Sequence, residues 1–282
     1  MKQLTIAGQT VPAIGIGTWH MGDQPAQRSA EIAAIQAGIA AGARVIDTAE
    51  MYGAGRAESL VGEALANERR EDLFLISKVL PENASRQKLA VSLDASLQRL
   101  RTDYLDLYLY HWRGTVPLAE TVSTLQQLQT TGKIRAWGIS NFDQADLNEL
   151  WSLPGGNQAA ANEDLYHLGS RGLEYDVLPW QRAHQLPLIA YSPIAQGDVW
   201  GHHLTTNEIV QQVAAAHHAT VYQVLLAWVI RQPQTLAIPQ TSSIAHMQQN
   251  IAAGALTLTA EELAQLDQAF PAPTTKQPLD TL

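Results

Sequence analysis

The chain has 282 residues, 46% of them hydrophobic and 16% charged, which is enough for one α/β barrel with a buried core and excludes a disordered chain. Its 18 basic and 27 acidic residues give a net charge of -9, which disfavours binding to nucleic-acid phosphates and anionic membranes through repulsion. The chain contains no cysteine, so disulfides, thiolate metal sites and cysteine nucleophiles are excluded.

The start of the chain does not resemble an export signal. Residues Met1 to Gly8 lack the long apolar run of a secretory signal peptide. The apolar run from Val224 to Ile230 is far too short to span a bilayer. We therefore expect a cytoplasmic protein that does not bind membranes and that folds as a single domain over residues 1–282.

Short apolar runs alternate with helix-length amphipathic stretches along the whole chain. This alternation is typical of βα units around a parallel sheet. Because the number of predicted strands is that of a TIM barrel, we predict an α/β fold of the (β/α)8 type, preceded by an N-terminal hairpin. The predicted strands are residues 14–17, 44–46, 73–77, 104–110, 134–139, 159–162, 188–191 and 235–238.

A helix is expected after each strand, near residues 27–41, 57–67, 86–100, 118–131, 144–151, 173–185, 221–231 and 244–253. Two extra helices are predicted near 206–217 and 260–269, the second opened by a capping box of Thr259 and Glu262. An open, doubly wound sheet is the alternative fold. However, no Gly-x-Gly-x-x-Gly turn follows the first strand and no shift in composition marks a second domain.

Polar residues follow the predicted strands at the point where each strand ends. Asp47, Lys78 and His111 each come directly after an apolar run. Active sites of such barrels lie at the carboxyl ends of the strands, where all the loops converge. We expect the same rim to carry the polar residues Ser140, Asn141, Glu163, Tyr191 and Ser192.

Each of these side chains also has an ordinary structural explanation. Asp47 could be a turn or helix cap, His111 a buried histidine bonded to the backbone, and Tyr52 a packed rim aromatic. Lys78 is harder to explain, because lysine rarely approaches a core without an acidic partner or a function. A proton donor, a cation, its carboxylate and a neutral ring on neighbouring strands together favour a catalytic group.

Four segments resemble the signatures of the aldo-keto reductase family: VIDTAEMYG at 45–53, ISK at 76–78, LYLYHW at 107–112 and GISNF at 138–142. They occur in the family's order, are joined by YSPI at 191–194 and IP at 238–239, and cover nearly the whole chain. The stretch HWRG at 111–114 and the short tail resemble bacterial methylglyoxal reductase-like members of the family.

The resemblance implies NAD(P)H-dependent reduction of aldehydes or ketones, with Tyr52 as the general acid. Lys78, held by Asp47, would favour the phenolate formed after proton transfer, and His111 would orient the carbonyl oxygen. The expected substrate-binding residues are Trp19, Met51, Tyr52, His111 and Trp112.

The same resemblance implies a nicotinamide stacked on Tyr191, with NADPH as the expected cofactor and NADH as the second candidate. Where relatives commonly carry glutamine, this chain has Glu163, which suggests an altered cofactor affinity or a raised carboxyl pKa. Gln240 and His246 replace the basic residues that bind the 2′-phosphate, which weakens the expected preference for NADPH. The expected cofactor contacts are Thr18, Trp19, Asp47, Ser140, Asn141, Glu163, Tyr191, Ser192, Ile194, Gln240, Thr241, Ser242, His246 and Asn250.

Other functions remain open at this point. A nucleotide-binding regulatory protein could keep the same fold, and the same residues could reduce imines or oxidise alcohols. A metal-dependent lyase or hydrolase is disfavoured, because the pair His202-His203 is expected in a loop without spaced partners, so we expect no metal. We expect a monomer. The short segment 196–203 and the short tail after Pro273 predict an open pocket, with nothing long folded over the barrel mouth.

Overall fold

A ring of parallel strands forms the centre of the computed structural model, which describes residues 1–196 and 199–282. Within these residues, eight strands pair in the order β10-β9-β8-β7-β6-β5-β4-β3. Ile14, just before β3, forms a parallel bridge with Ala237 at the other end of the sheet, so the two end strands meet. The (β/α)8 prediction is confirmed. The strands are β3 (Ile16–Gly17), β4 (Val45–Asp47), β5 (Phe74–Val79), β6 (Leu105–Tyr110), β7 (Ile134–Ser140), β8 (Asn162–Leu165), β9 (Leu188–Tyr191) and β10 (Thr235–Ala237).

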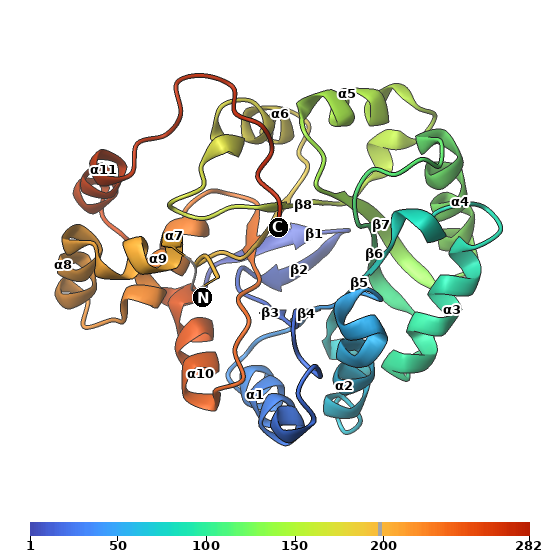
Figure 1. Cartoon of the computed structure of the whole chain (residues 1–282), viewed down its shortest axis with the longest axis horizontal. Helices are drawn as coiled ribbons and strands as arrows, with labels where there is room; N and C mark the ends of the chain where they lie inside the picture. The colour runs from blue at the N-terminus through green and yellow to red at the C-terminus, as the bar shows by residue number, and fades with distance from the viewer. Residues whose placement is uncertain (197–198) are drawn as a thin grey trace.

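Helices surround the strands on the outside (Figure 1). Those that follow the strands are α1 (Arg28–Ala40), α2 (Arg56–Ala64), α3 (Leu89–Leu100), α4 (Leu118–Thr130), α5 (Gln144–Ser152), α6 (Val177–Ala183), α9 (Val221–Val229) and α10 (Ile244–Ala252). The two predicted extra helices are present as α8 (Glu208–Ala216) and α11 (Ala260–Ala269), and Thr259 and Glu262 form the capping box. In the part of the chain that the structure describes, no helix is both long and apolar enough to cross a membrane.

One helix was not predicted. Residues Val199–Thr206 form α7, where the sequence suggested a loop, so the pair His202-His203 lies on a helix. Residues 197–198, which belong to the segment expected to leave the pocket open, lie outside the described residues.

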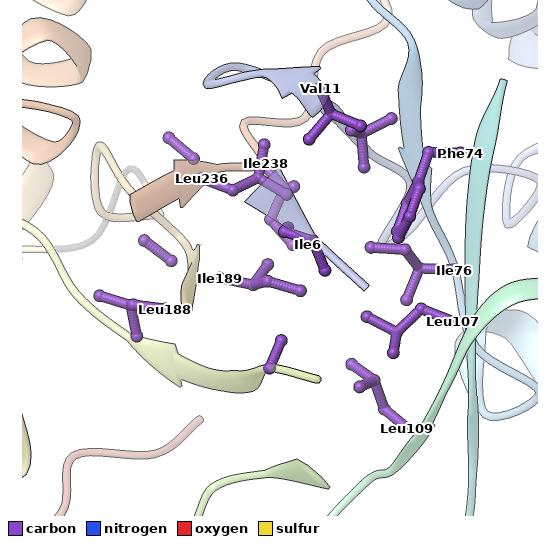
Figure 2. Close-up of a cluster of buried hydrophobic side chains, with 14 of the residues drawn as sticks. Ile6, Val11, Phe74, Ile76, Leu107, Leu109, Leu188, Ile189, Leu236 and Ile238 are labelled. Carbon is purple, nitrogen blue, oxygen red and sulfur yellow. The ribbon is translucent and has the colours of Figure 1, made fainter. Parts of the chain in front are cut away.

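A hairpin closes the amino-terminal end of the barrel, as predicted. Its strands are β1 (Gln3–Ile6) and β2 (Gln9–Pro12), joined by a turn in which Gly8 has a φ of 76°. Figure 2 shows Ile6 and Val11 of the hairpin among side chains of the barrel strands. Because the chain passes from β2 directly into β3, the hairpin lies at the amino ends of the strands, and the opposite end is left for a site.

Most strand boundaries differ from the prediction by a few residues, and the changes in β5 and β8 concern charged residues. β5 continues to Val79, so Lys78 lies within it, and β8 overlaps the predicted strand 159–162 at Asn162 alone. Glu163 is therefore inside β8 and paired with Ser140 of β7. The prediction stopped or misplaced strands at charged residues, because an apolar pattern cannot show that a buried charge has a partner on another strand.

The carboxyl-terminal tail folds back to the barrel mouth (Figure 1), whereas the short tail was expected to leave an open pocket with nothing long folded over it. Ser170 Oγ donates a hydrogen bond of 2.5 Å to Asp280 Oδ2, and Lys276 Nζ lies 3.3 Å from Asp176 Oδ2. The last two residues, Thr281 and Leu282, reach the cavity described below. These contacts join residues far apart in the chain, so no local pattern signals them.

Candidate active site

The ammonium group of Lys78 is the centre of a buried polar cluster at the carboxyl ends of the strands. Its Nζ lies 2.6 Å from Asp47 Oδ1, 3.1 Å from Thr48 O and 3.1 Å from the Tyr52 hydroxyl. Glu163 Oε1 lies 3.3 Å from the same nitrogen. A buried ammonium is tolerated only with such partners, because its desolvation must be offset by opposite charge and hydrogen bonds.

Adjacent elements bring these groups together. Asp47 is the last residue of β4 and pairs with Ile76 of β5, two residues before Lys78. Tyr52 begins the short helix η2 (Tyr52–Gly55), and its backbone N–H donates to Ala49 O at 3.1 Å. The turn between β4 and η2 therefore returns the phenol toward the barrel axis, where it reaches Lys78.

Burial and charge act in opposite directions on the cluster. Burial would lower the pKa of Lys78, but the neighbouring carboxyls of Asp47 and Glu163 outweigh it and raise that pKa, so the lysine stays an ammonium. Burial raises the pKa of Tyr52, and Lys78 opposes this only in part. Burial dominates, so Tyr52 holds its proton before any reaction. That Lys78 favours the phenolate formed after proton transfer stays a prediction.

His111 follows β6 and contacts the same cluster. Its backbone N–H donates to Val79 O at 3.1 Å, and its ring lies edge-on to that of Tyr52, with centroids 5.9 Å apart. Burial, assisted by the Lys78 charge, lowers the pKa of His111 to about 2. The ring is therefore neutral at physiological pH, and its Nδ1 has no hydrogen-bond partner among the described residues.

A chain of hydrogen bonds positions the polar residues on the other side of the rim. Tyr191 Oη donates to Asn141 Oδ1 at 2.8 Å, and Asn141 Nδ2 donates to Ser140 Oγ at 3.0 Å. Ser140 Oγ donates to Glu163 O at 2.8 Å, and Asn141 Nδ2 also reaches His111 O at 3.1 Å. This network fixes Asn141 in a left-handed conformation, with a φ of 58°.

A cavity of about 560 Å³ opens above these groups. Four of its lining residues were not predicted from the sequence: Arg113, Asp146, Thr281 and Leu282. Arg113 lies in the quoted stretch 111–114, whereas nothing in the sequence indicated that the tail residues reach the site. The other lining residues are Trp19, Met51, Tyr52, His111, Trp112, Ser140, Asn141, Glu163 and Tyr191.

A second cavity, of about 380 Å³, continues from the first and shares Trp19, Tyr52 and Tyr191 with it. It runs to Pro239 and Gln240 after β10, and is also lined by Thr18, Asp47, Ser192 and Ile194. Together the two cavities form an elongated site, the shape that a dinucleotide requires. The Thr18 hydroxyl already donates to Asp47 O at 2.8 Å, so it supports the buried cluster.

The remaining predicted cofactor residues lie beyond this second cavity. Thr241 and Ser242 are half-buried, and His246 is exposed in the first turn of α10. Asn250, later in that helix, is buried. The adenosine end of the site thus offers hydroxyl groups, a helix N-terminus and one imidazole for binding a phosphate.

The residues present fit a nicotinamide. Glu163 Oε2 is buried, faces no hydrogen-bond partner among the described residues, and belongs to a residue that lines the first cavity. It is therefore available to a ligand N–H donor such as a carboxamide. Among the same residues, no group of three or more His, Asp or Glu side chains could hold a metal ion.

Comparisons with known proteins point to one family. The family described as "Aldo/keto reductase family" matches residues 13–270. The chain is 52% identical to the methylglyoxal reductase YeaE of Escherichia coli over 280 residues, which cover 99% of this chain and 98% of that protein.

Solved structures from Klebsiella pneumoniae are similar over the whole chain. An aldo/keto reductase in complex with NADP and acetate has 49% identity and a TM-score of 0.97, covering 100% of this chain and 99% of that one. An aldo-keto reductase in complex with NADPH has 48% identity and a TM-score of 0.96, covering 100% of both chains.

Proposed function

Since the chain belongs to the aldo/keto reductase family, we propose that its substrates are small aldehydes of the methylglyoxal type, reduced with Tyr52 as the proton donor. It is an NAD(P)H-dependent oxidoreductase that reduces aldehydes and ketones to alcohols. The observation that carries the assignment of roles is the buried contact of Tyr52 with Lys78, which is itself paired with Asp47.

Tyr52 is suited to donate a proton to the substrate oxygen. Its raised pKa keeps the phenol protonated while the substrate binds. When bound, the reduced nicotinamide supplies a hydride, and the carbonyl oxygen then becomes an alkoxide, a stronger base than a phenolate. Lys78, 3.1 Å from the phenol oxygen, stabilises the phenolate left behind, and Asp47 keeps the ammonium in place.

His111 orients the carbonyl group. Because its ring is neutral, it can donate one hydrogen bond to the carbonyl oxygen without competing with Tyr52 as an acid. Trp19, Met51 and Trp112 border the cavity with apolar surface, which favours compounds with a small apolar part and limits the water that reaches the reacting carbon.

The cofactor is NADPH, and its contacts are proposed from the second cavity and the rim. Tyr191 would stack on the nicotinamide, with Ser140, Asn141 and Glu163 around the carboxamide. Ser192, Ile194 and Gln240 line the path toward the adenosine end. His246 and the hydroxyls of Thr241 and Ser242 belong to residues within a few positions of the start of α10, where a 2′-phosphate would bind.

We further propose that residues 1–282 form one domain and act as a monomer in the cytoplasm. The contact between Ile14 and Ala237, which joins the first and last strands of the barrel, supports the single domain. The similarity to enzymes that also align over their whole length supports the same view.

Steady-state kinetics test the substrate. We expect methylglyoxal to be reduced with a higher kcat/KM than a bulky aromatic aldehyde, with NADPH preferred to NADH, when nicotinamide absorbance is followed. An aromatic aldehyde turned over far better than methylglyoxal would contradict the proposed substrate, while leaving the reaction class intact.

A further inference from the structure

Glu163 places a second carboxyl beside Lys78, and no step proposed above uses it. We propose that Glu163 stores a proton, held in the free enzyme and beside reduced nicotinamide, and released beside oxidised nicotinamide. The inference rests on the proposed function, because that function places the nicotinamide next to Glu163.

The buried cluster contains two carboxyl groups but only one ammonium group. Lys78 Nζ lies 2.6 Å from Asp47 and 3.3 Å from Glu163, and both acidic side chains are 2% exposed. One ammonium cannot neutralise two carboxylates where water is excluded, so one of the two carboxyls holds a proton. Asp47 is nearer to the ammonium, and we therefore assign the proton to Glu163.

The unused oxygens support this assignment. Asp47 Oδ2 and Glu163 Oε2 are both buried, and neither has a partner among the described residues. A protonated Glu163 has an O–H that Asp47 can accept, and its other oxygen still accepts a hydrogen bond. Burial and the Asp47 charge raise the pKa of Glu163 well above its usual range, although the positive charge of Lys78 acts to lower it.

The other titratable groups around Glu163 are neutral. Burial raises the pKa of Tyr52, in η2, and of Tyr191, in β9, so both phenols are protonated. His111, after β6, has its pKa lowered to about 2 and is uncharged. Within the described part of this rim, the charge that Glu163 experiences thus comes from Lys78 on β5 and Asp47 on β4.

Oxidised nicotinamide changes this balance, because its ring carries a positive charge. With Glu163 protonated, Asp47 and Lys78 cancel and the cationic ring is left without a counter-charge. If Glu163 ionises, the site becomes neutral. The ring of reduced nicotinamide is neutral and does not stabilise a carboxylate at Glu163. Glu163 therefore stays protonated beside it.

The proton on Glu163 can also replace the one that Tyr52 gives to the substrate. Tyr52 loses one proton to the substrate oxygen. Lys78, within 3.1 Å of the phenol oxygen and 3.3 Å of Glu163 Oε1, can give a proton to the phenolate. Rotation of the Glu163 carboxyl then turns its O–H from Asp47 toward the neutral amine, which takes that proton. Tyr52 and Lys78 then regain their starting states, Glu163 is a carboxylate, and solvent returns its proton when the oxidised cofactor leaves.

Proton release on cofactor binding tests the inference. We would titrate the enzyme with NADP⁺ and with NADPH by calorimetry at pH 7, in two buffers of different ionisation enthalpy. The two ligands share the 2′-phosphate, so any contribution of His246 cancels in their difference. We expect NADP⁺ to release close to one more proton than NADPH, and the Kd of NADP⁺ relative to NADPH to fall about tenfold per pH unit as pH rises.

Two variants give the comparison. In Glu163→Gln, which keeps the shape of the side chain, both ligands should release the same number of protons, and the Kd ratio should not change with pH. Glu261→Gln, the same chemical change on an exposed residue of α11 that lines neither cavity, should behave like the parent.

The outcomes separate the two proposals. Binding of both ligands with equal proton release by the parent, or an unchanged difference in Glu163→Gln, overturns the role of Glu163 and leaves the reductase function standing. Failure of either dinucleotide to bind contradicts both. A merely structural role for Glu163 would change both affinities together and would not alter the pH dependence of their ratio.

Discussion

Lys78 Nζ lies 2.6 Å from Asp47 Oδ1, and the two side chains are 0% and 2% exposed. Such a pair is costly to break, because removing one partner leaves a buried charge without compensation. The same pair therefore stabilises the folded barrel and holds Lys78 beside Tyr52.

The first prediction concerns the stability of this pair. Lys78→Met should lower the free energy of unfolding by about 3–5 kcal/mol, because the buried carboxylate of Asp47 loses its counter-charge. The double variant Asp47→Asn/Lys78→Met should lose less than the sum of the two single variants. Urea unfolding followed by circular dichroism measures all three, and losses that simply add would show that the pair does not interact.

The neutral state of His111 makes stability depend on pH. Its pKa is lowered to about 2 in the folded protein, whereas an unfolded histidine titrates near about 6.5. Below pH 6.5 His111 becomes protonated in the unfolded chain but stays neutral in the folded chain. The free energy of unfolding therefore falls as pH falls. Relative to His111→Gln, the parent should lose about 2 kcal/mol of unfolding free energy between pH 7 and pH 5.

Urea unfolding at both pH values, with the two proteins side by side, checks this prediction. Because the other titrating groups are the same in both proteins, the change in their difference isolates His111. A constant difference would mean that His111 is not held neutral in the fold.

Cofactor preference should respond to positive charge at the start of α10. Gln240→Lys and His246→Arg each add a cation where a 2′-phosphate is expected. A charge-assisted contact contributes about 1.5–3 kcal/mol, so either change should raise the ratio of NADPH to NADH affinity by roughly tenfold to a hundredfold. Fluorescence titration with both dinucleotides measures it.

Gln212→Lys adds the same charge on the exposed surface of α8 and is the matched control. It should leave the ratio unchanged. An equal rise in the control and in the α10 variants would assign the effect to overall charge rather than to a phosphate site.

The tail should limit the size of the substrate. Thr281 and Leu282 line the cavity, and Ser170 holds the preceding Asp280. Removing the last two residues should raise kcat/KM for an aromatic aldehyde several-fold relative to methylglyoxal, because the cavity becomes wider. Ser170→Ala should shift the ratio in the same direction by less, and an unchanged ratio in both proteins would show that the tail does not border the bound substrate.

The barrel and the polar residues on its rim could be predicted because both depend on local order along the chain. Alternating strands and helices define the (β/α)8 fold, and the end of each strand places Asp47 and His111 at one end of the barrel. The resemblance to known reductases added roles that residue types alone left open. In particular, it distinguished Tyr52 from a packed rim aromatic.

What could not be predicted depends on contacts between distant segments. Lys78 and Glu163 lie inside strands because each is compensated across the barrel, and a hydrophobic pattern has no signal for such a partner. The tail reaches the cavity through the contact of Ser170 with Asp280, which lie 110 positions apart. The dominance of burial over the Lys78 charge at Tyr52 likewise requires the folded environment.

The most direct test of the central claim is the rate of NADPH oxidation by Tyr52→Phe with methylglyoxal, measured beside its affinity for NADPH. The account predicts a rate lowered by about 10²–10⁴, because the carbonyl oxygen loses its proton donor, and a Kd for NADPH within a few-fold of the parent's. A variant that reduces methylglyoxal at the parent's rate would contradict the role of Tyr52 and the mechanism built on it.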